Sequence, residues 1–218
     1  MEQGFWNERW AQGQIGFHKP EAHDLLVAHH GRIERRQRVY VPLCGKSVDL
    51  IWLRDRGHDV VGSEFVGAAI EAFFKEQLPE ATPTSTRVNE LVLHETSGIR
   101  IVQGDAFAVD SFATGGRVDA IWDRAALVAI DPATRPRYVE ALSRVLREGG
   151  VILLVTFAYD QTKLPGPPWS VGDDEVQALF GGAYTIEKLA ARAESPGPKF
   201  VEAGVTSLME SVFLLTKR

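Results

Sequence analysis

The sequence predicts a doubly wound α/β fold, in which helices cover both faces of a mostly parallel sheet. Along most of the chain, apolar runs of strand length alternate with segments whose apolar residues recur at helical spacing. The runs are apolar at almost every position, which is typical of parallel strands that are buried on both faces. The chain has 218 residues, of which 44% are hydrophobic and 24% charged, and this composition suits one globular domain over residues 1–218.

Two strand–helix units open the predicted sheet. Residues 39–43 and 58–64 are the strands, and each is followed by a segment of helical spacing, at 48–53 and 68–77. Gly57 ends the first helix, as glycine often does because it accepts the left-handed conformation. A proline just beyond the second helix ends that one.

The rest of the chain continues the alternation. Residues 99–102, 118–122 and 151–157 are apolar runs, and the amphipathic helix 136–146 precedes the last of them. The remaining elements are a short helix at 176–180 and two late strands at 183–189 and 208–216. Little helical signal separates the late strands, so we expect one of them to run antiparallel.

Two segments interrupt the pattern. Residues 1–35 carry Trp6, Trp10 and Phe17, and we expect an N-terminal helical cover that packs its aromatic face on the domain. Closure of a site by stacking on a ligand ring is the alternative for these aromatic side chains. Residues 79–98 form a polar insertion that could hold a small hairpin.

Charge and cysteine content limit the function classes. The net charge of −5 argues against a nucleic-acid partner, which would need clustered basic residues. The single cysteine, Cys44, forms no intrachain disulfide and is interpreted as a structural thiol. No apolar run approaches the ~20 residues of a membrane span, and the N-terminus is unlike a signal peptide. We therefore expect a cytoplasmic monomer without a membrane or metal partner, and we interpret His29 and His30 as solvated rather than as ligands.

Candidate site residues follow the ends of the predicted strands, where ligands bind in such sheets. The loop 42–47 contains Gly45 and leads into a helix, although it is neither a dinucleotide fingerprint nor a P-loop. Glu64 ends the second strand, 19 residues after Gly45, which is the spacing of a carboxylate that binds ribose hydroxyls. An ordinary turn and a solvated acid are the alternatives. Together the two features favour a cofactor that contains ribose.

Two further charged residues follow later strands. Asp105 comes after the third strand and could accept from a base amine, or simply cap a turn. Arg124 follows Asp123 at the end of the fourth strand. It could attract an anionic acceptor or lower its pKa, or form a local pair with another side chain.

Five segments of the chain resemble the bacterial thiopurine S-methyltransferases, in order along nearly the whole sequence. They are FWNERWAQGQIGFH at 5–18, VPLCGKSVDLIWLRDRGHDVVGSE at 41–64, IWDRAALVAI at 121–130, YDQTKLPGPPW at 159–169 and LLTKR at 214–218. The PLCGK and WDR-A-LVAI segments set this family apart among class I methyltransferases. The resemblance implies a seven-stranded class I (Rossmann-like) fold and S-adenosylmethionine as the cofactor, with S-adenosylhomocysteine as the product.

Site residues carry over by motif position. The resemblance implies cofactor binding by Trp10, Leu43, Glu64, Asp105, Ala106 and Arg124. It places Phe17 against the acceptor ring and the catalytic Arg124 between cofactor and acceptor, and it makes the proline-rich loop 160–172 part of a lid. Some relatives have arginine in a C-terminal loop where this chain has Lys199, so the resemblance leaves the role of Lys199 open.

The implied reaction is in-line methyl transfer to the sulfur of a small aromatic or heterocyclic thiol such as a thiopurine. Selenium and tellurium compounds are further acceptors that the resemblance allows. Two alternatives stay open on the residues alone. A nicotinamide-dependent oxidoreductase would use the same ribose carboxylate, although it would usually carry a glycine-rich fingerprint. A binding module without turnover could use the same fold.

Overall fold

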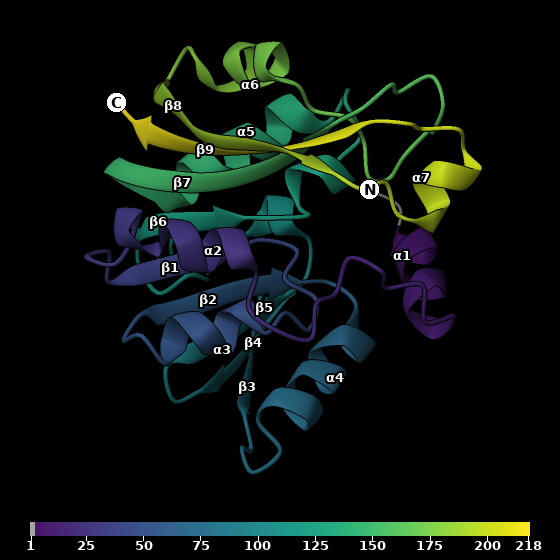
Figure 1. Ribbon diagram of the computed structural model, residues 1–218. Coiled ribbons are helices and arrows are strands. Elements are labelled where there is room, and N and C mark those ends of the chain that lie inside the picture. The colour runs from purple at the N-terminus through teal and green to yellow at the C-terminus, as the bar shows by residue number, and fades with distance from the viewer. Residues whose placement is uncertain (1–2) are drawn as a thin grey trace.

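Nine strands form one sheet in the computed structural model, which describes residues 3–218 (Figure 1). The strands are β1 (Arg38–Val41), β2 (Asp59–Glu64), β3 (Thr84–Val88), β4 (Leu91–Thr96), β5 (Ile99–Gln103), β6 (Val118–Asp123), β7 (Leu146–Ala158), β8 (Tyr184–Glu194) and β9 (Leu208–Lys217). Their order across the sheet is β3-β4-β5-β2-β1-β6-β7-β9-β8. The pairs β5–β2, β2–β1, β1–β6 and β6–β7 are parallel, while β9 runs antiparallel to both of its neighbours. The expected mostly parallel sheet with one antiparallel late strand is thus confirmed.

The expected count of seven strands is wrong, because an additional hairpin of two strands brings the sheet to nine. The insertion 79–98 folds into β3 and β4, and β4 pairs antiparallel with β5, which extends the sheet at that edge. Asn89 lies in the two-residue turn of this hairpin with a φ of 54°. Asparagine tolerates this left-handed conformation, which tight hairpin turns require. The polar composition that made the insertion look irregular suits an edge hairpin whose first strand is exposed.

Helices cover both faces of the sheet. They are α1 (Gln3–Ala11), α2 (Asp24–His29), α3 (Asp49–Arg54), α4 (Gly67–Gln77), α5 (Arg135–Val145), α6 (Asp173–Phe180) and α7 (Pro198–Glu202), with 3₁₀ turns at His30–Arg32, Ala106–Ala108 and Leu127–Ala129. The helices expected at 48–53, 68–77, 136–146 and 176–180 are α3 to α6. The helix α7 was not predicted, because its five residues begin at Pro198, two residues after Pro196, and show no apolar period.

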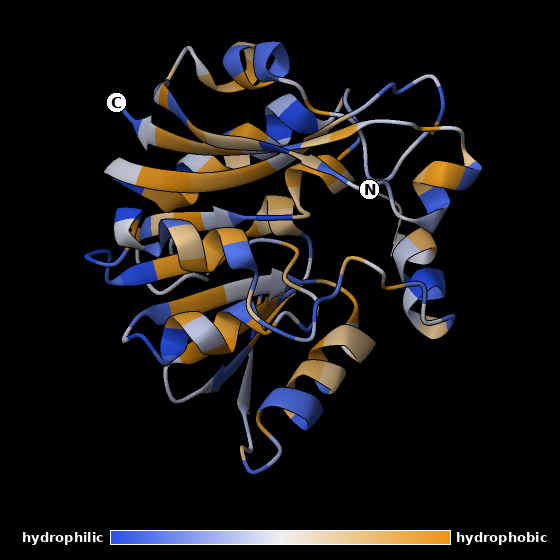
Figure 2. Cartoon of the chain, in the orientation of Figure 1, coloured by the Kyte–Doolittle hydropathy of each residue, from blue (hydrophilic) through white to orange (hydrophobic). Residues whose placement is uncertain are grey.

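Alternate residues of the strands point into two separate cores. Val39 and Val41 pack with apolar residues of α2, α3 and α4, whereas Tyr40 between them packs with residues of α5 and α6. Figure 2 shows that the middle strands are largely hydrophobic along their length. This double burial explains why their sequences lack the polar alternation of a one-sided sheet. Among residues 3–218, no helix combines the length and apolar character that crossing a bilayer requires.

His30 was interpreted as solvated, and that interpretation is wrong. Its Nε2 atom lies 2.9 Å from Nε2 of His58, whose Nδ1 lies 2.6 Å from the Arg36 carbonyl oxygen. Its ring packs edge-on against Trp52, with the ring centroids 5.0 Å apart. No local pattern predicts this contact, because His58 lies 28 residues further along the chain, directly before β2.

Candidate functional site

A cavity of ≈ 380 Å³ lies at the carboxyl ends of the parallel strands. The loops after β1, β2 and β6 line it, and so do residues of α1 and α7, two helices that lie next to each other in Figure 1. Most of its lining is apolar or aromatic, and the residues named for the site that line it are Trp10, Phe17, Leu43, Glu64 and Arg124. The fold therefore gathers five of the seven predicted site residues around one space.

Glu64 lies at the end of β2 and is 6% exposed. One carboxylate oxygen accepts the Gly45 N–H at 2.9 Å, and the other accepts the N–H groups of Phe65 and Val66 at 2.7 and 2.8 Å. Burial raises the pKa of this carboxyl group, while the three backbone N–H groups act in the opposite direction. The residue is therefore a fixed acceptor beside the cavity rather than a solvated acid, and it suits the paired hydroxyls of a ribose.

The backbone around this carboxylate is held in unusual conformations. Leu43 and Ala125 have φ values of 48° and 61°, and both line the cavity directly after β1 and β6. Non-glycine residues rarely adopt this left-handed region, and they do so mainly where a site demands it. Gly45 shares the conformation with a φ of 53°, and a Cβ atom there would lie 3.1 Å from the Trp10 ring. The strand ends are thus shaped to bring backbone close to a ligand.

Arg124 projects into the cavity from the end of β6. Its Nη1 donates a hydrogen bond to the Phe17 carbonyl oxygen at 2.5 Å, and its Nε atom is buried without a hydrogen-bond partner in the described chain. Burial lowers the pKa of its guanidinium group, and nearby carboxylates, Asp49 first among them, oppose this. A cation in this position, without a carboxylate in contact among residues 3–218, is suited to an anionic ligand.

Asp123, the neighbour of Arg124, does not pair with it. Its carboxylate accepts the Tyr138 hydroxyl at 2.8 Å and the Leu127 N–H at 3.0 Å on the other side of the sheet. Burial raises the pKa of this fully enclosed carboxyl group to about 6. The local pair considered as an alternative for Arg124 is therefore absent, because adjacent strand residues point to opposite faces.

The aromatic residues of the N-terminal cover pack on one another and line the cavity together. The rings of Trp6 and Trp10 meet Phe17 edge-on, at centroid distances of 6.0 and 6.2 Å. These rings therefore pack within the protein, as expected, and the same packed face also lines the cavity, where a ligand ring could stack on it.

Asp105 and Ala106 lie outside the lining of the cavity in the described chain. Asp105 is exposed, and its side chain accepts the Phe107 N–H at 3.0 Å at the start of a 3₁₀ turn. Ala106 is buried below it. In this structure Asp105 therefore caps a turn, which was the alternative to its accepting a hydrogen bond from a base amine.

Three cationic residues of the lining, Arg9, Lys19 and Lys199, are not among the predicted site residues. Arg9 comes from α1 and Lys199 from α7, and with Lys19 and Arg124 they give the lining four cations against the single anion Glu64. Burial lowers the pKa of Lys199, and the charge of Arg9 lowers it further. The Lys199 Nζ donates to the Pro167 carbonyl oxygen in the proline-rich loop. A signal for Arg9 was present, since positions 6, 9 and 10 share one face of a helix.

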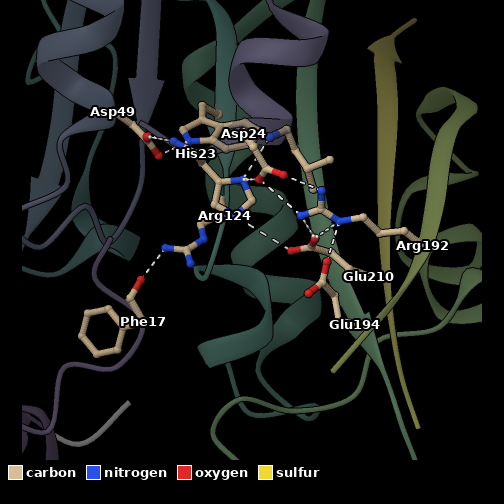
Figure 3. A network of polar contacts seen from close by, with 10 residues as sticks. Phe17, His23, Asp24, Asp49, Arg124, Arg192, Glu194 and Glu210 are labelled. Carbon is tan, nitrogen blue, oxygen red and sulfur yellow. Dashed lines mark hydrogen bonds and ion pairs between the residues drawn. The ribbon is translucent and has the colours of Figure 1, made fainter. Parts of the chain in front are cut away.

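His23 is drawn near Arg124 in Figure 3 and is 6% exposed. Its backbone N–H donates to Asp49 at 2.8 Å, and its Nδ1 accepts the Leu25 N–H at the start of α2. The second oxygen of Asp49 accepts Nε1–H of Trp122 at 2.8 Å. Burial, followed by the charge of Arg124, lowers the pKa of His23 from 6.5 to about 4. The ring is therefore neutral at neutral pH.

The pKa of His23 predicts a loss of stability in acid. Because the folded state resists protonation of the ring, its contribution is complete above the unfolded pKa and is lost as the pH falls from 6.5 towards 4. We expect the wild type to lose about 2 kcal/mol of unfolding free energy between about pH 7.5 and about pH 5 relative to His23→Asn. Asparagine keeps a helix-capping acceptor without a titrating group. Urea unfolding at both pH values measures this, and parallel changes in the two proteins would contradict it.

The comparisons with known proteins agree along the whole chain. A model of the thiopurine S-methyltransferase (TPMT) family matches residues 1–218. The chain is 44% identical over 221 residues to a thiopurine S-methyltransferase of Pseudomonas fluorescens (strain SBW25), covering 100% of both chains. It is 42% identical to one of Aliivibrio fischeri (strain MJ11), covering 99% of each.

A solved structure shares the fold at low identity. The 1,6-didemethyltoxoflavin-N1-methyltransferase of Burkholderia thailandensis, solved with bound 1,6-didemethyltoxoflavin and S-adenosylhomocysteine, aligns with a TM-score of 0.66 at 16% identity. The alignment covers 99% of this chain and 87% of that one. The family model and the full-length relatives favour methyl transfer over the hydride transfer that was the alternative. The chain belongs to the thiopurine S-methyltransferase family and is an S-adenosylmethionine-dependent methyltransferase with a class I fold.

Proposed function

We propose that this enzyme methylates the sulfur of small aromatic or heterocyclic thiols, thiopurines among them, and that selenium and tellurium analogues are further acceptors. The observation that carries the proposal is the unpaired guanidinium of Arg124 in a cavity with mostly apolar and aromatic walls. A flat, apolar ring with an ionised chalcogen atom matches both properties. A monomer in the cytoplasm is part of the same proposal.

The cofactor half of the site is assigned to the strand ends. Glu64 would accept the ribose hydroxyls, Leu43 would lie against the nucleoside, and Trp10 would cover it. The buried carboxylate of Glu64 and the close approach of Gly45 to the Trp10 ring support this fit. Asp105 and Ala106 are assigned to the adenine side, next to β5. Bound there, S-adenosylmethionine supplies an electrophilic methyl group.

The acceptor half is assigned to Phe17 and Arg124. Arg124 favours the thiolate over the thiol through its charge, so an aromatic thiol needs no general base. Phe17 packs on the acceptor ring, and its carbonyl oxygen keeps the guanidinium in place through the Arg124 hydrogen bond. Holding the sulfur in line with the methyl group is then the main contribution to the rate.

Two segments are assigned to water exclusion. The cover segment 1–35 contributes Trp6 and Trp10 to the cavity wall, and the loop 160–172 contributes Pro167 and Pro168. Closing these over the acceptor would keep water from the charged reactants. The contact between Lys199 and the Pro167 carbonyl links this loop to α7.

The test uses acceptors that differ in one atom. With methyl-labelled S-adenosylmethionine, we expect label in 6-mercaptopurine and thiophenol and almost none in phenol. Thiophenol and phenol differ only in the acceptor atom and have similar shapes, but phenol is far less ionised near neutral pH. Counting label in the extracted product measures transfer. Equal labelling of phenol and thiophenol, or none in either thiol, would refute sulfur as the acceptor atom.

A further inference from the structure

Arg192 holds three carboxylates at the edge of the site region. It lies on β8 directly opposite Glu210 of β9 in the antiparallel register. Its guanidinium lies 2.6 Å from Glu210, 2.5 Å from Asp24 and 2.7 Å from Glu194 (Figure 3). Arg192 is partly exposed, whereas Glu210 is only 3% exposed, so the arginine is the ion-pair partner of a buried carboxylate.

Two of these carboxylates also act on Arg124. Asp49, Glu210 and Asp24 are the groups that oppose the lowering of the Arg124 pKa, in that order. None of the three forms an ion pair with Arg124 among residues 3–218. Asp49 is occupied by the His23 N–H and by Trp122, and Glu210 and Asp24 are occupied by Arg192. Figure 3 shows Arg124 turned towards the Phe17 carbonyl instead.

Removing Arg192 would leave Glu210 buried without its cation. A buried carboxylate that has lost its partner is strongly unfavourable and turns to another cation where one is near. The His23 ring, with Nε2 3.9 Å from Glu210, is neutral near neutral pH because its pKa is about 4. Arg124 is the other arginine in this group of side chains (Figure 3).

We propose that Arg192 is a positioning residue of the methyl-transfer site: by holding the buried Glu210, it keeps that carboxylate off Arg124 and leaves the Arg124 guanidinium open to the acceptor thiolate. The proposal rests on the proposed function, in which Arg124 attracts the ionised sulfur. It extends the site to a side chain on the penultimate strand that touches neither cofactor nor acceptor.

The test is a rescue experiment at about pH 8, where aromatic thiols are largely ionised. We expect Arg192→Gln to raise KM for thiophenol about tenfold, the size of one lost contact with a charged group, with a much smaller change in kcat. Glu210→Gln alone should stay within about twofold of the wild type. The double variant Arg192→Gln/Glu210→Gln should return to near the wild-type KM, because no carboxylate is left at position 210 to occupy Arg124.

A matched control removes a different arginine that contacts β8. Arg32 pairs with the exposed Glu187, and Arg32→Gln should leave KM unchanged. Thermal unfolding of every variant shows whether it folds, and Arg192→Met, which keeps much of the apolar stem but removes the charge, replaces Arg192→Gln if the latter does not. A double variant as impaired as Arg192→Gln would overturn the proposal, since the arginine would then be only structural. A wild-type KM in Arg192→Gln would overturn it as well.

A second measurement separates this proposal from the proposed function. Calorimetry gives the affinity of thiophenol for the protein loaded with S-adenosylhomocysteine, without turnover. The same pattern of loss and rescue in affinity, in a protein that transfers no methyl group to any thiol, would refute the proposed function but support the role of Arg192. If the protein transfers methyl groups to thiols but no substitution at Arg192 alters that transfer, the result would support the proposed function and refute the role of Arg192. No measurable thiol binding at all would refute both.

Discussion

Replacing Arg124 by alanine is expected to lower the rate of methyl transfer to thiophenol about 100-fold, as for the loss of one preorganised charge contact at a reacting atom. The guanidinium projects into the cavity, is partly buried and has no carboxylate in contact in the described chain. In an apolar surrounding such a charge acts more strongly on a thiolate than it would in water. Initial rates at saturating S-adenosylmethionine measure the effect.

Two further variants separate charge from packing at this position. Arg124→Lys keeps the charge and should lose about tenfold, since it loses the planar donor set. Arg117→Ala removes an arginine at the other end of the same strand, where it donates to the Leu146 carbonyl, and should leave the rate unchanged. The affinity for S-adenosylhomocysteine should be recorded with each, because Arg124 also holds the Phe17 carbonyl. A full rate in Arg124→Ala would contradict the proposed mechanism.

Replacing Glu64 by alanine is expected to weaken the binding of S-adenosylhomocysteine about 100-fold, the size of two lost hydrogen bonds to a charged acceptor. The carboxylate lies at the end of β2 in a fixed orientation, held by three backbone N–H groups. The affinity should also fall in acid. Burial raises the pKa of this group, and the protonated form can accept fewer hydrogen bonds from the ribose. Calorimetry across a range of pH measures both effects.

The matched control for Glu64 lies on the same strand. Asp59 begins β2 and pairs with Arg38, far from the cavity, so Asp59→Asn should leave the affinity unchanged. Glu64→Ala also leaves the three N–H groups without their acceptor, so its stability without ligand must be measured separately. Wild-type affinity in a folded Glu64→Ala would refute the ribose assignment. Protection from heat by NADH as strong as that by S-adenosylhomocysteine would favour a nicotinamide site instead.

The central sheet could be predicted from local patterns because each buried strand has a nearly continuous apolar sequence. For the same reason Glu64 and Arg124 could be predicted as site residues. Each is a charged residue that directly follows such a strand, and parallel strands end at one edge. The hairpin β3–β4 and the helix α7 could not be predicted with the same clarity. Both are short, and their conformation depends on pairing with β5 and on packing beside the cavity.

The sequence by itself determined the fold class, the family and the edge of the sheet that carries the chemistry, since all three follow from residue types in chain order. The tertiary structure alone decided which charges meet there. Arg9 and Lys199 face one space although 190 positions separate them. Glu210 contacts Arg192 rather than Arg124 because β8 and β9 pair in one particular register. Coulomb energies depend on distance and burial, and neither can be obtained from the order of residues along the chain.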